Sequence, residues 1–144
     1  MTIRELLKTK PPDIYSVTPD ATVLEALELM AARNIGVVLV VNALGQLVGI
    51  LSERDYARKV VLRGLTSRDT PVAGIMTTDV LRISADRTLE DCMALMTAAR
   101  IRHVPVMDGD RLSGVVSIGD LGKAIIAEQG FVIGHLERYI CGSR

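Results

Sequence analysis

Apolar residues recur at helical spacing early in the chain, after a short extended piece at residues 14–17. Positions 23, 26, 27 and 30 share one helical face, so the pattern predicts a helix packed on a core. Thr22 opens this helix, because a threonine followed at i+3 by an acidic residue, here Glu25, is a helix-start signal. A shorter apolar pattern over residues 3–7 predicts another helix, which ends before a pair of prolines.

The pattern then changes from helical to extended. Residues 35–41 form a β-branched run without polar alternation, which predicts a strand buried on both faces. A turn at residues 42–45 returns the chain as a second strand over residues 47–51. A helix from Glu53 to about Arg63 follows. The predicted unit is therefore an extended piece, a helix, two strands and a second helix.

This unit occurs twice, at an offset of 66 residues that becomes 65 after a deletion in the turn. The repeat predicts two domains, residues 1–70 and residues 71–144, the second with a C-terminal extension, and residues 72–76 mirror the pattern of residues 3–7. A common fold explains repeated apolar positions, whereas repeated polar positions are harder to explain by packing. The repeated polar residues are Asp20 with Asp86, Thr22 with Thr88, Ser52 with Ser117, and Asp55 with Asp120.

The C-terminal extension carries a partly helical apolar pattern that has to be buried somewhere. It packs either on its own repeat or across a subunit interface, and the residues leave both possibilities open. The pattern consists of Phe131, Ile133, Leu136, Tyr139 and Ile140.

The repeated serine and aspartate lie where a predicted strand turns into a predicted helix. Ser52 precedes Asp55 by three residues, and Ser117 precedes Asp120 by the same spacing. Such a pair can cap the helix and do nothing more. The N–H groups of a helix start also favour an anion, so a phosphate site is the second interpretation. Recurrence of both polar residues favours the second one.

Composition excludes several classes of function. The 17 basic and 17 acidic residues cancel, and aromatic residues make up 3% of the chain, so we expect no nucleic-acid partner. No apolar run reaches the length of a membrane span, and the N-terminus lacks a signal-peptide pattern, so we expect no membrane partner and a cytoplasmic protein. Cys92 and Cys141 do not suggest a disulfide framework, and His103 and His135 have no partners at metal-ligand spacing.

Several motifs together resemble a known family. They are Ile75-Met76-Thr77 before an extended piece, Thr22-Val23-x-Glu25-Ala26 with its echo, Arg102-His103-Val104-Pro105-Val106, and Gly-x-x-Ser-x-x-Asp twice. In this combination the chain resembles a tandem cystathionine-β-synthase (CBS) domain pair of the stand-alone bacterial type. The resemblance covers nearly the whole chain. It implies an α+β fold in which two β-α-β-β-α repeats pack about a pseudo-twofold axis, and it leaves no room for a catalytic domain.

The resemblance also implies two clefts that bind adenine nucleotides. Carried over by position, Asp55 and Asp120 hold ribose hydroxyls, and Ser52 and Ser117 face the phosphate. The adenine lies between the extended piece and the start of the long strand in each repeat, where backbone groups read its edge. The other residues that the resemblance assigns to nucleotide binding are Ile14, Tyr15, Thr18, Ile35, Gly36, Val37, Glu53, Arg54, Val80, Ser84, Ile101, Arg102, His103, Val104, Pro105, Ile118 and Gly119.

The two copies of the motif differ in the cations that they offer. Arg54 lies between the first Ser and Asp, whereas the second copy has Ile118 and Gly119 there. The second repeat instead carries Arg102 and His103 at its strand entrance. Exposed basic residues often form only a solvated helix face, so a role for Arg54 in phosphate binding stays open beside that interpretation.

We therefore expect a regulatory module that senses an adenosine-containing nucleotide. AMP is the expected ligand, with ADP, ATP or NAD(H) as alternatives, and a homodimer that acts on an unidentified regulated protein is the expected assembly. One alternative is a dimeric interaction scaffold without a ligand, in which the serines and aspartates only cap helices. Another is a small nucleotide-processing enzyme that uses His103 with Ser117 or Cys92, but no third orienting group is indicated, so we expect no enzyme and no catalytic residue.

Overall fold

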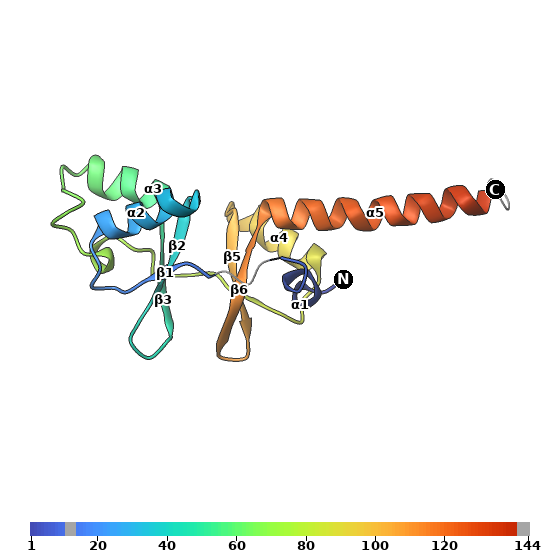
Figure 1. The fold of residues 1–144 in the computed structure, drawn as a ribbon, viewed down its shortest axis with the longest axis horizontal. Helices are drawn as coiled ribbons and strands as arrows, with labels where there is room; N and C mark the ends of the chain where they lie inside the picture. The colour runs from blue at the N-terminus through green and yellow to red at the C-terminus, as the bar shows by residue number, and fades with distance from the viewer. Residues whose placement is uncertain (11–13, 141–144) are drawn as a thin grey trace. The chain divides into compact units, whose positions relative to one another are not determined.

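A computed structural model of the 144-residue chain describes residues 1–10 and 14–140, and residues 130–140 without their side chains. The chain forms two compact units (Figure 1). We call Asp13–Leu81 the repeat-one unit, and Met1–Pro12 together with Arg82–Arg144 the repeat-two unit. These units are defined by packing. The division at residues 70 and 71 describes the sequence repeat and stays a prediction.

The repeat-one unit is a three-stranded sheet with helices packed on it. The strands run in the order β1-β2-β3, with β1 parallel to β2 and β2 antiparallel to β3. The elements in chain order are β1 (Ser16–Val17), α2 (Val23–Arg33), β2 (Val37–Val41), β3 (Leu47–Ser52), α3 (Glu53–Tyr56), the π-helix η1 (Ala57–Val61) and the 3-10 helix η2 (Val72–Gly74).

The repeat-two unit repeats this topology, with strand order β4-β5-β6, a parallel β4·β5 pair and an antiparallel β5·β6 pair. The two units together confirm the predicted α+β fold of two related repeats. The elements of this unit are α1 (Ile3–Leu7), β4 (Ile83–Ser84), α4 (Leu89–Ala99), β5 (His103–Asp108), β6 (Arg111–Ser117) and α5 (Ile118–Ile140).

Local sequence explains where α2 and α4 begin and end. Thr22 and Thr88 cap them, each accepting a hydrogen bond from the backbone N–H three residues later, as the helix-start signals predicted. Both helices end at a residue in the left-handed conformation, Asn34 at φ 54° and Arg100 at φ 56°. The middle of β2 is fully buried, which confirms the prediction of a strand covered on both faces.

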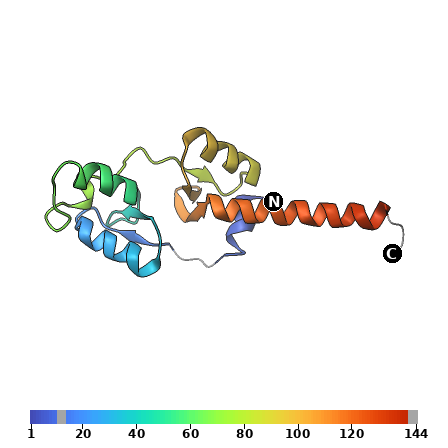
Figure 2. The same cartoon turned by 90° about the horizontal axis from the view of Figure 1, so that it is seen from above.

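Each unit completes its core with a short helical segment from outside its own repeat motif. Ile3 and Leu6 of α1 belong to the core of the repeat-two unit, although α1 precedes repeat one in the sequence. In the repeat-one unit, Val72 and Ile75 in and after η2 are the corresponding buried residues. Figure 2 shows α1 beside the elements of the repeat-two unit.

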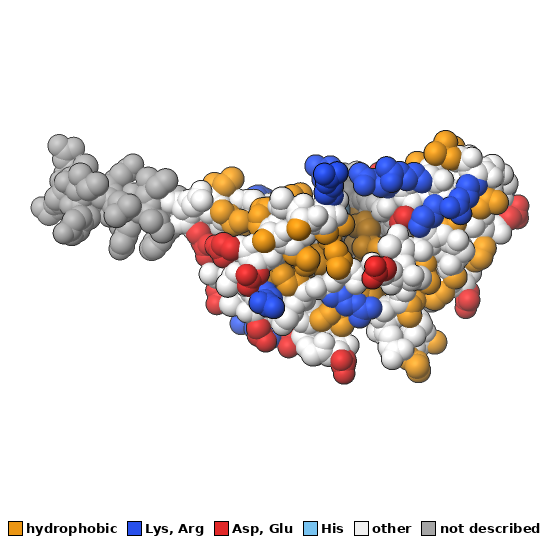
Figure 3. Space-filling model, turned by 180° about the vertical axis from the view of Figure 1, so that it is seen from behind, with side chains coloured by type: hydrophobic (Ala, Val, Ile, Leu, Met, Phe, Trp, Pro, Cys, Tyr) orange, Lys and Arg blue, Asp and Glu red, His pale blue; other side chains and the backbone are white. Residues whose placement is uncertain are grey.

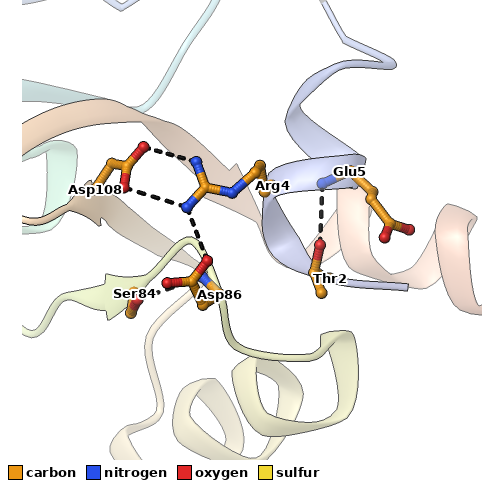
Figure 4. Close-up of polar contacts among 6 residues, drawn as sticks. All are labelled: Thr2, Arg4, Glu5, Ser84, Asp86 and Asp108. Atoms are coloured by element: carbon orange, nitrogen blue, oxygen red, sulfur yellow. Dashed lines mark hydrogen bonds and ion pairs between the residues drawn. The ribbon is translucent and has the colours of Figure 1, made fainter.

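Polar contacts hold α1 in place (Figure 4). The Arg4 guanidinium donates to both carboxylate oxygens of Asp108, at 2.6 and 3.2 Å, and to Asp86 at 2.8 Å. The backbone N–H of Ile3 donates to the carbonyl of Arg87 at 2.8 Å. Thr2 caps the helix by accepting from the N–H of Glu5. The segment is therefore an integral part of the repeat-two unit.

Two predicted elements differ from those in the structure. The predicted α-helix from Glu53 to about Arg63 is α-helical only to Tyr56, and residues 57–61 then form the π-helix η1. Residues 72–76 mirror α1 in burial, but their helix is a 3-10 turn over residues 72–74. The apolar pattern at residues 131–140 lies on the helical backbone of α5, and the burial predicted for its side chains lies outside the described part of the chain.

Candidate functional site

The first Ser-x-x-Asp motif lies at the junction of β3 and α3. Ser52 ends the strand, and its hydroxyl accepts a hydrogen bond from the N–H of Asp55 at 3.1 Å. The Asp55 carboxylate reaches back and accepts from the N–H of Ser52 at 3.0 Å. This reciprocal pair is a capping box, so the capping interpretation is correct as geometry.

Asp55 makes further contacts that the motif does not predict. Its second oxygen, Oδ1, accepts from the Thr77 hydroxyl at 3.2 Å and pairs with the Lys59 ammonium at 3.2 Å. Lys59 also donates to the carbonyl of Ile75 at 3.0 Å. Thr77 is held in turn by two backbone hydrogen bonds with Ile50, each 2.9 Å. Both carboxylate oxygens of Asp55 are therefore occupied, and its side chain is only 13% exposed.

The second motif has the same capping geometry at the junction of β6 and α5. The N–H of Asp120 donates to the Ser117 hydroxyl, and the N–H of Ser117 donates to Asp120 Oδ2, both at 3.0 Å. The same Oδ2 accepts from the Lys10 ammonium at 2.7 Å, and Lys10 also donates to the carbonyl of Val115 at 2.8 Å.

These contacts set the charge state of Asp120. Burial raises the pKa of this carboxyl, but hydrogen bonds from Lys10 and from Ser117 outweigh burial, and the pKa lies below its ordinary value. Asp120 is therefore an anion at neutral pH, with a side chain that is 28% exposed. A partly exposed carboxylate at a strand-to-helix junction is able to accept hydrogen bonds from a ligand.

The structure brings the starts of the long strands next to the two serines. Ser52 pairs with Val37 across the β2·β3 ladder, and Ser117 pairs with His103 across the β5·β6 ladder. One residue earlier, the carbonyl of Gly36 accepts from Glu53 at 3.0 Å and that of Arg102 accepts from Ile118 at 2.8 Å. The predicted strand-entrance residues therefore lie beside the motif in each unit.

The extended pieces also lie along these strands. The carbonyl of Tyr15 accepts a hydrogen bond from the N–H of Leu39 at 3.1 Å, and Ser16 and Val17 form β1 beside β2. Ser84 has the corresponding place beside β5, whereas Val80 belongs to the repeat-one unit. The Tyr15 ring has a partner that the sequence did not indicate, since the Arg33 guanidinium lies 5.2 Å from its centre.

The predicted site residues differ in exposure, and their roles in binding stay predictions. The buried ones are Val104 and Pro105, so their backbone groups are the parts that remain for contact. The half-buried ones are Ile14, Tyr15, Ile35, Gly36, Val37, Val80, Ile101 and His103. The exposed ones are Thr18, Glu53, Arg54, Ser84, Arg102, Ile118 and Gly119.

Two lysines that the sequence analysis did not assign to the site pair with the aspartates. Lys59 is four residues after Asp55, a helical spacing at which opposite charges meet, so local pattern was a usable signal. Lys10 is 110 residues before Asp120, and no local pattern links them. Arg54, whose role in phosphate binding the sequence left open, is exposed. Figure 3 shows Lys and Arg side chains exposed on one face of the molecule.

Other chemistry finds little support within residues 1–10 and 14–140. No group of three or more His, Cys, Asp or Glu side chains there is placed to hold a metal ion. Cys92 is buried in the core of the repeat-two unit, and burial raises the pKa of its thiol to about 11, which disfavours a reactive thiolate. None of the described helices combines the length and apolar character needed to cross a membrane.

Comparison with known proteins agrees with this architecture. The CBS domain family model matches the chain twice, over residues 3–62 and 72–127, so the chain belongs to the CBS-domain family as a tandem pair. The mitochondrial CBS domain-containing protein CBSX3 of Arabidopsis thaliana is 36% identical over 98% of this chain and 72% of its own length.

Solved structures show the same fold. A CBS-domain protein from Burkholderia ambifaria is 47% identical, with a TM-score of 0.84 over 90% of this chain and 96% of that one. A CBS domain pair solved in complex with 5′-methylthioadenosine and S-adenosyl-L-methionine is 25% identical, with a TM-score of 0.74 over 89% of this chain and 98% of that one. Pairs of this family are generally regulatory and bind ligands.

Proposed function

We propose that this protein is a regulatory module that binds adenosine-containing nucleotides at its two Ser-x-x-Asp motifs. AMP is the expected ligand, with ADP, ATP or NAD(H) as alternatives. The observation that carries the proposal is the pair of lysine-paired, partly exposed aspartates at equivalent strand-to-helix junctions of a CBS pair. A related pair that holds two adenosine compounds supports the ligand class.

The chemistry of the motif suits a nucleotide. A carboxylate presents two acceptor oxygens to a vicinal diol, as the acidic residue of dinucleotide-binding folds does for ribose. The serine hydroxyl lies 3.1 Å from the carboxylate in the first motif, and the serine N–H lies 3.0 Å from it in the second. In both motifs a lysine ammonium pairs with the carboxylate. A phosphate attached to the ribose would therefore meet a polar and cationic surrounding.

A ligand-free interaction scaffold is the second candidate, and a specific observation favours it. Each aspartate already caps its helix and pairs with a lysine, so the contacts of Asp55 and Asp120 are explained without any ligand. The two functions predict different responses to nucleotide, and one experiment separates them.

The remaining parts of the proposal concern context. We infer that the chain regulates another protein, has no catalytic activity of its own, and is a cytoplasmic homodimer. Exposed apolar side chains on α5 support the dimer, among them Ile126, which is 70% exposed. Most soluble oligomers are symmetric dimers, which makes this assembly the simplest one that covers such a side chain.

The test is a thermal melt with and without nucleotide. AMP at about 100 times its Kd stabilises the wild type by about 2.7 kcal/mol per independent site, which raises Tm by about 5 to 10 °C. We expect Asp55→Asn and Asp120→Asn each to lose much of this increment, because a neutral amide replaces the charged acceptor. 2′-Deoxy-AMP should protect the wild type less than AMP.

The matched control is Asp110→Asn, which makes the same chemical change at an exposed position of the β5–β6 turn. It should keep the full AMP response. If both motif variants also keep the full response, the ribose assignment is wrong. If no variant and no wild-type sample responds to AMP, ATP or NAD at millimolar concentration, the scaffold function is the correct one.

A further inference from the structure

The Lys10 ammonium occupies one of the two Asp120 oxygens that the proposed function offers to a ribose diol at the second motif. It lies 2.7 Å from Oδ2 and 2.8 Å from the Val115 carbonyl, and 29% of its side chain is exposed. Lys10 belongs to neither Ser-x-x-Asp motif and reaches Asp120 from the segment after α1. This contact is thus a tertiary ion pair that joins the N-terminal segment to the candidate site.

The position of Lys10 follows from the docking of α1. Ile3 is fully buried, Arg4 pairs with Asp86 and Asp108, and the Leu7 side chain lies against Gly114 of β6. The chain from residue 3 to residue 10 therefore leaves the core at a fixed point beside β6. Because docking of α1 already orders the backbone up to this point, the Lys10–Asp120 ion pair costs little additional chain entropy.

The first motif has a different arrangement. Lys59 comes from the same helical stretch as Asp55, at the i,i+4 spacing, and its longer contact of 3.2 Å is to Oδ1. There the oxygen that closes the capping box, Oδ2, is not the one that meets lysine. At Asp120 a single oxygen, Oδ2, receives both the Ser117 N–H and the Lys10 ammonium.

We propose that Lys10 determines ligand selectivity at the second motif, as an internal cation that a ribose has to displace from Asp120. This inference rests on the proposed function. A neutral nucleoside replaces the ammonium–carboxylate ion pair with hydroxyl–carboxylate hydrogen bonds and leaves the ammonium without its anion. A nucleotide supplies a phosphate, so the ammonium exchanges one anionic partner for another. The second motif therefore selects phosphorylated ligands over adenosine.

The experiment isolates the second motif in the full chain by using Asp55→Asn as background. Calorimetry then gives the Kd of AMP and of adenosine with Lys10 intact and with Lys10→Met, which keeps the length of the side chain and removes its charge. We expect adenosine to bind more tightly to the methionine variant. We also expect the preference for AMP over adenosine to fall about tenfold, the loss of one charge-assisted contact.

Three controls keep the result specific. Lys8→Met removes a charge from an exposed position of the same segment and should leave the preference unchanged. Lys10→Gln retains a donor for Val115 and should reproduce the effect of methionine if that variant folds poorly. In the Asp120→Asn background, Lys10→Met should have no effect on the preference, as a double-mutant cycle requires for a pairwise interaction.

The outcomes separate this inference from the function on which it rests. If AMP binding depends on Asp120 but the preference for AMP over adenosine is the same with Lys10 and with Lys10→Met, the role of Lys10 is overturned. The proposed function then stays intact. A complete absence of nucleotide binding in the wild type and in both lysine variants overturns the two together. A fall in the preference that also occurs with Lys8→Met would mark general electrostatics and overturn the specific role.

Discussion

His103 lies at the start of β5, opposite Ser117, among the charged groups of the second motif. Burial lowers the pKa of its imidazole, Asp120 opposes this shift, and Lys10 and Arg102 add to it. The imidazole is therefore neutral at physiological pH. A neutral ring can donate one hydrogen bond and accept another, which suits the edge of a base better than a phosphate.

This pKa predicts how stability depends on pH. The unfolded chain takes up a proton near the ordinary value of 6.5, whereas the folded chain does so only at lower pH. The contribution of His103 to stability is therefore present above pH 6.5 and lost as pH falls toward the folded pKa. We expect the free energy of unfolding to fall less between about pH 7.5 and about pH 5 in His103→Gln than in the wild type, as measured with urea.

A direct measurement is an NMR titration of the imidazole, assigned by comparison with His103→Gln. A His103 resonance that titrates at or above pH 6.5 contradicts the prediction.

Gly49 and Gly114 are equivalent buried positions, but their surroundings differ. A Cβ at Gly49 would lie 2.6 Å from the Met76 sulfur and 3.1 Å from the carbonyl oxygen of Thr77. A Cβ at Gly114 would lie 3.0 Å from the end of the Leu7 side chain. The Thr77 backbone is held by its bridge to Ile50, whereas a leucine side chain can rotate.

We therefore expect Gly49→Ala to lower the free energy of unfolding by about 2 kcal/mol and Gly114→Ala by about 1 kcal/mol or less. Each variant is the control for the other, because both glycines lie at the same place in the two hairpins. Urea unfolding measures both, and an equal or reversed order contradicts the explanation.

The short helix α1 shows how much one element can contribute from outside its repeat. Ile3 is 0% exposed and lies among residues of the repeat-two core, while its backbone N–H bonds to the carbonyl of Arg87. Five helical residues are too few to be stable alone, so packing rather than propensity holds α1.

Ile3→Ala should accordingly reduce the free energy of unfolding by about 2–5 kcal/mol, the range for a fully buried aliphatic side chain. Leu44→Ala is the matched control, because Leu44 is 82% exposed in the β2–β3 turn and its truncation should change stability by less than about 0.5 kcal/mol. Denaturant unfolding compares them. A loss for Ile3→Ala as small as that of the control would show that α1 is not part of the core.

At the scale of the whole molecule, the internal repeat allowed the fold to be predicted from the sequence. Helix starts at Thr22 and Thr88 and the buried run of β2 depend on neighbours within a few residues, and such local signals were sufficient. The capping geometry of Ser52 with Asp55 was equally local. Family membership then follows from the combination of these local features in two copies.

Features that depend on contacts between residues far apart in the sequence could not be predicted from local patterns. Lys10 meets Asp120 across 110 positions, and α1 packs with the second repeat although it precedes the first. The π-helical turn after Tyr56 has no helix-breaking residue at its start, so propensity still predicted an α-helix there. Tertiary packing determines these three features, and it cannot be inferred from local patterns in a single sequence.

The docking of α1 also sets an order of events when the chain is synthesised. Residues 3 and 6 are synthesised long before Leu121, which belongs to the same core. The repeat-one unit ends at Leu81, so its partners are all present earlier. All residues of the repeat-one unit are therefore synthesised while the core partners of Ile3 and Leu6 are still incomplete. The core of Ile3 and Leu6 is therefore incomplete until Leu121 has been synthesised.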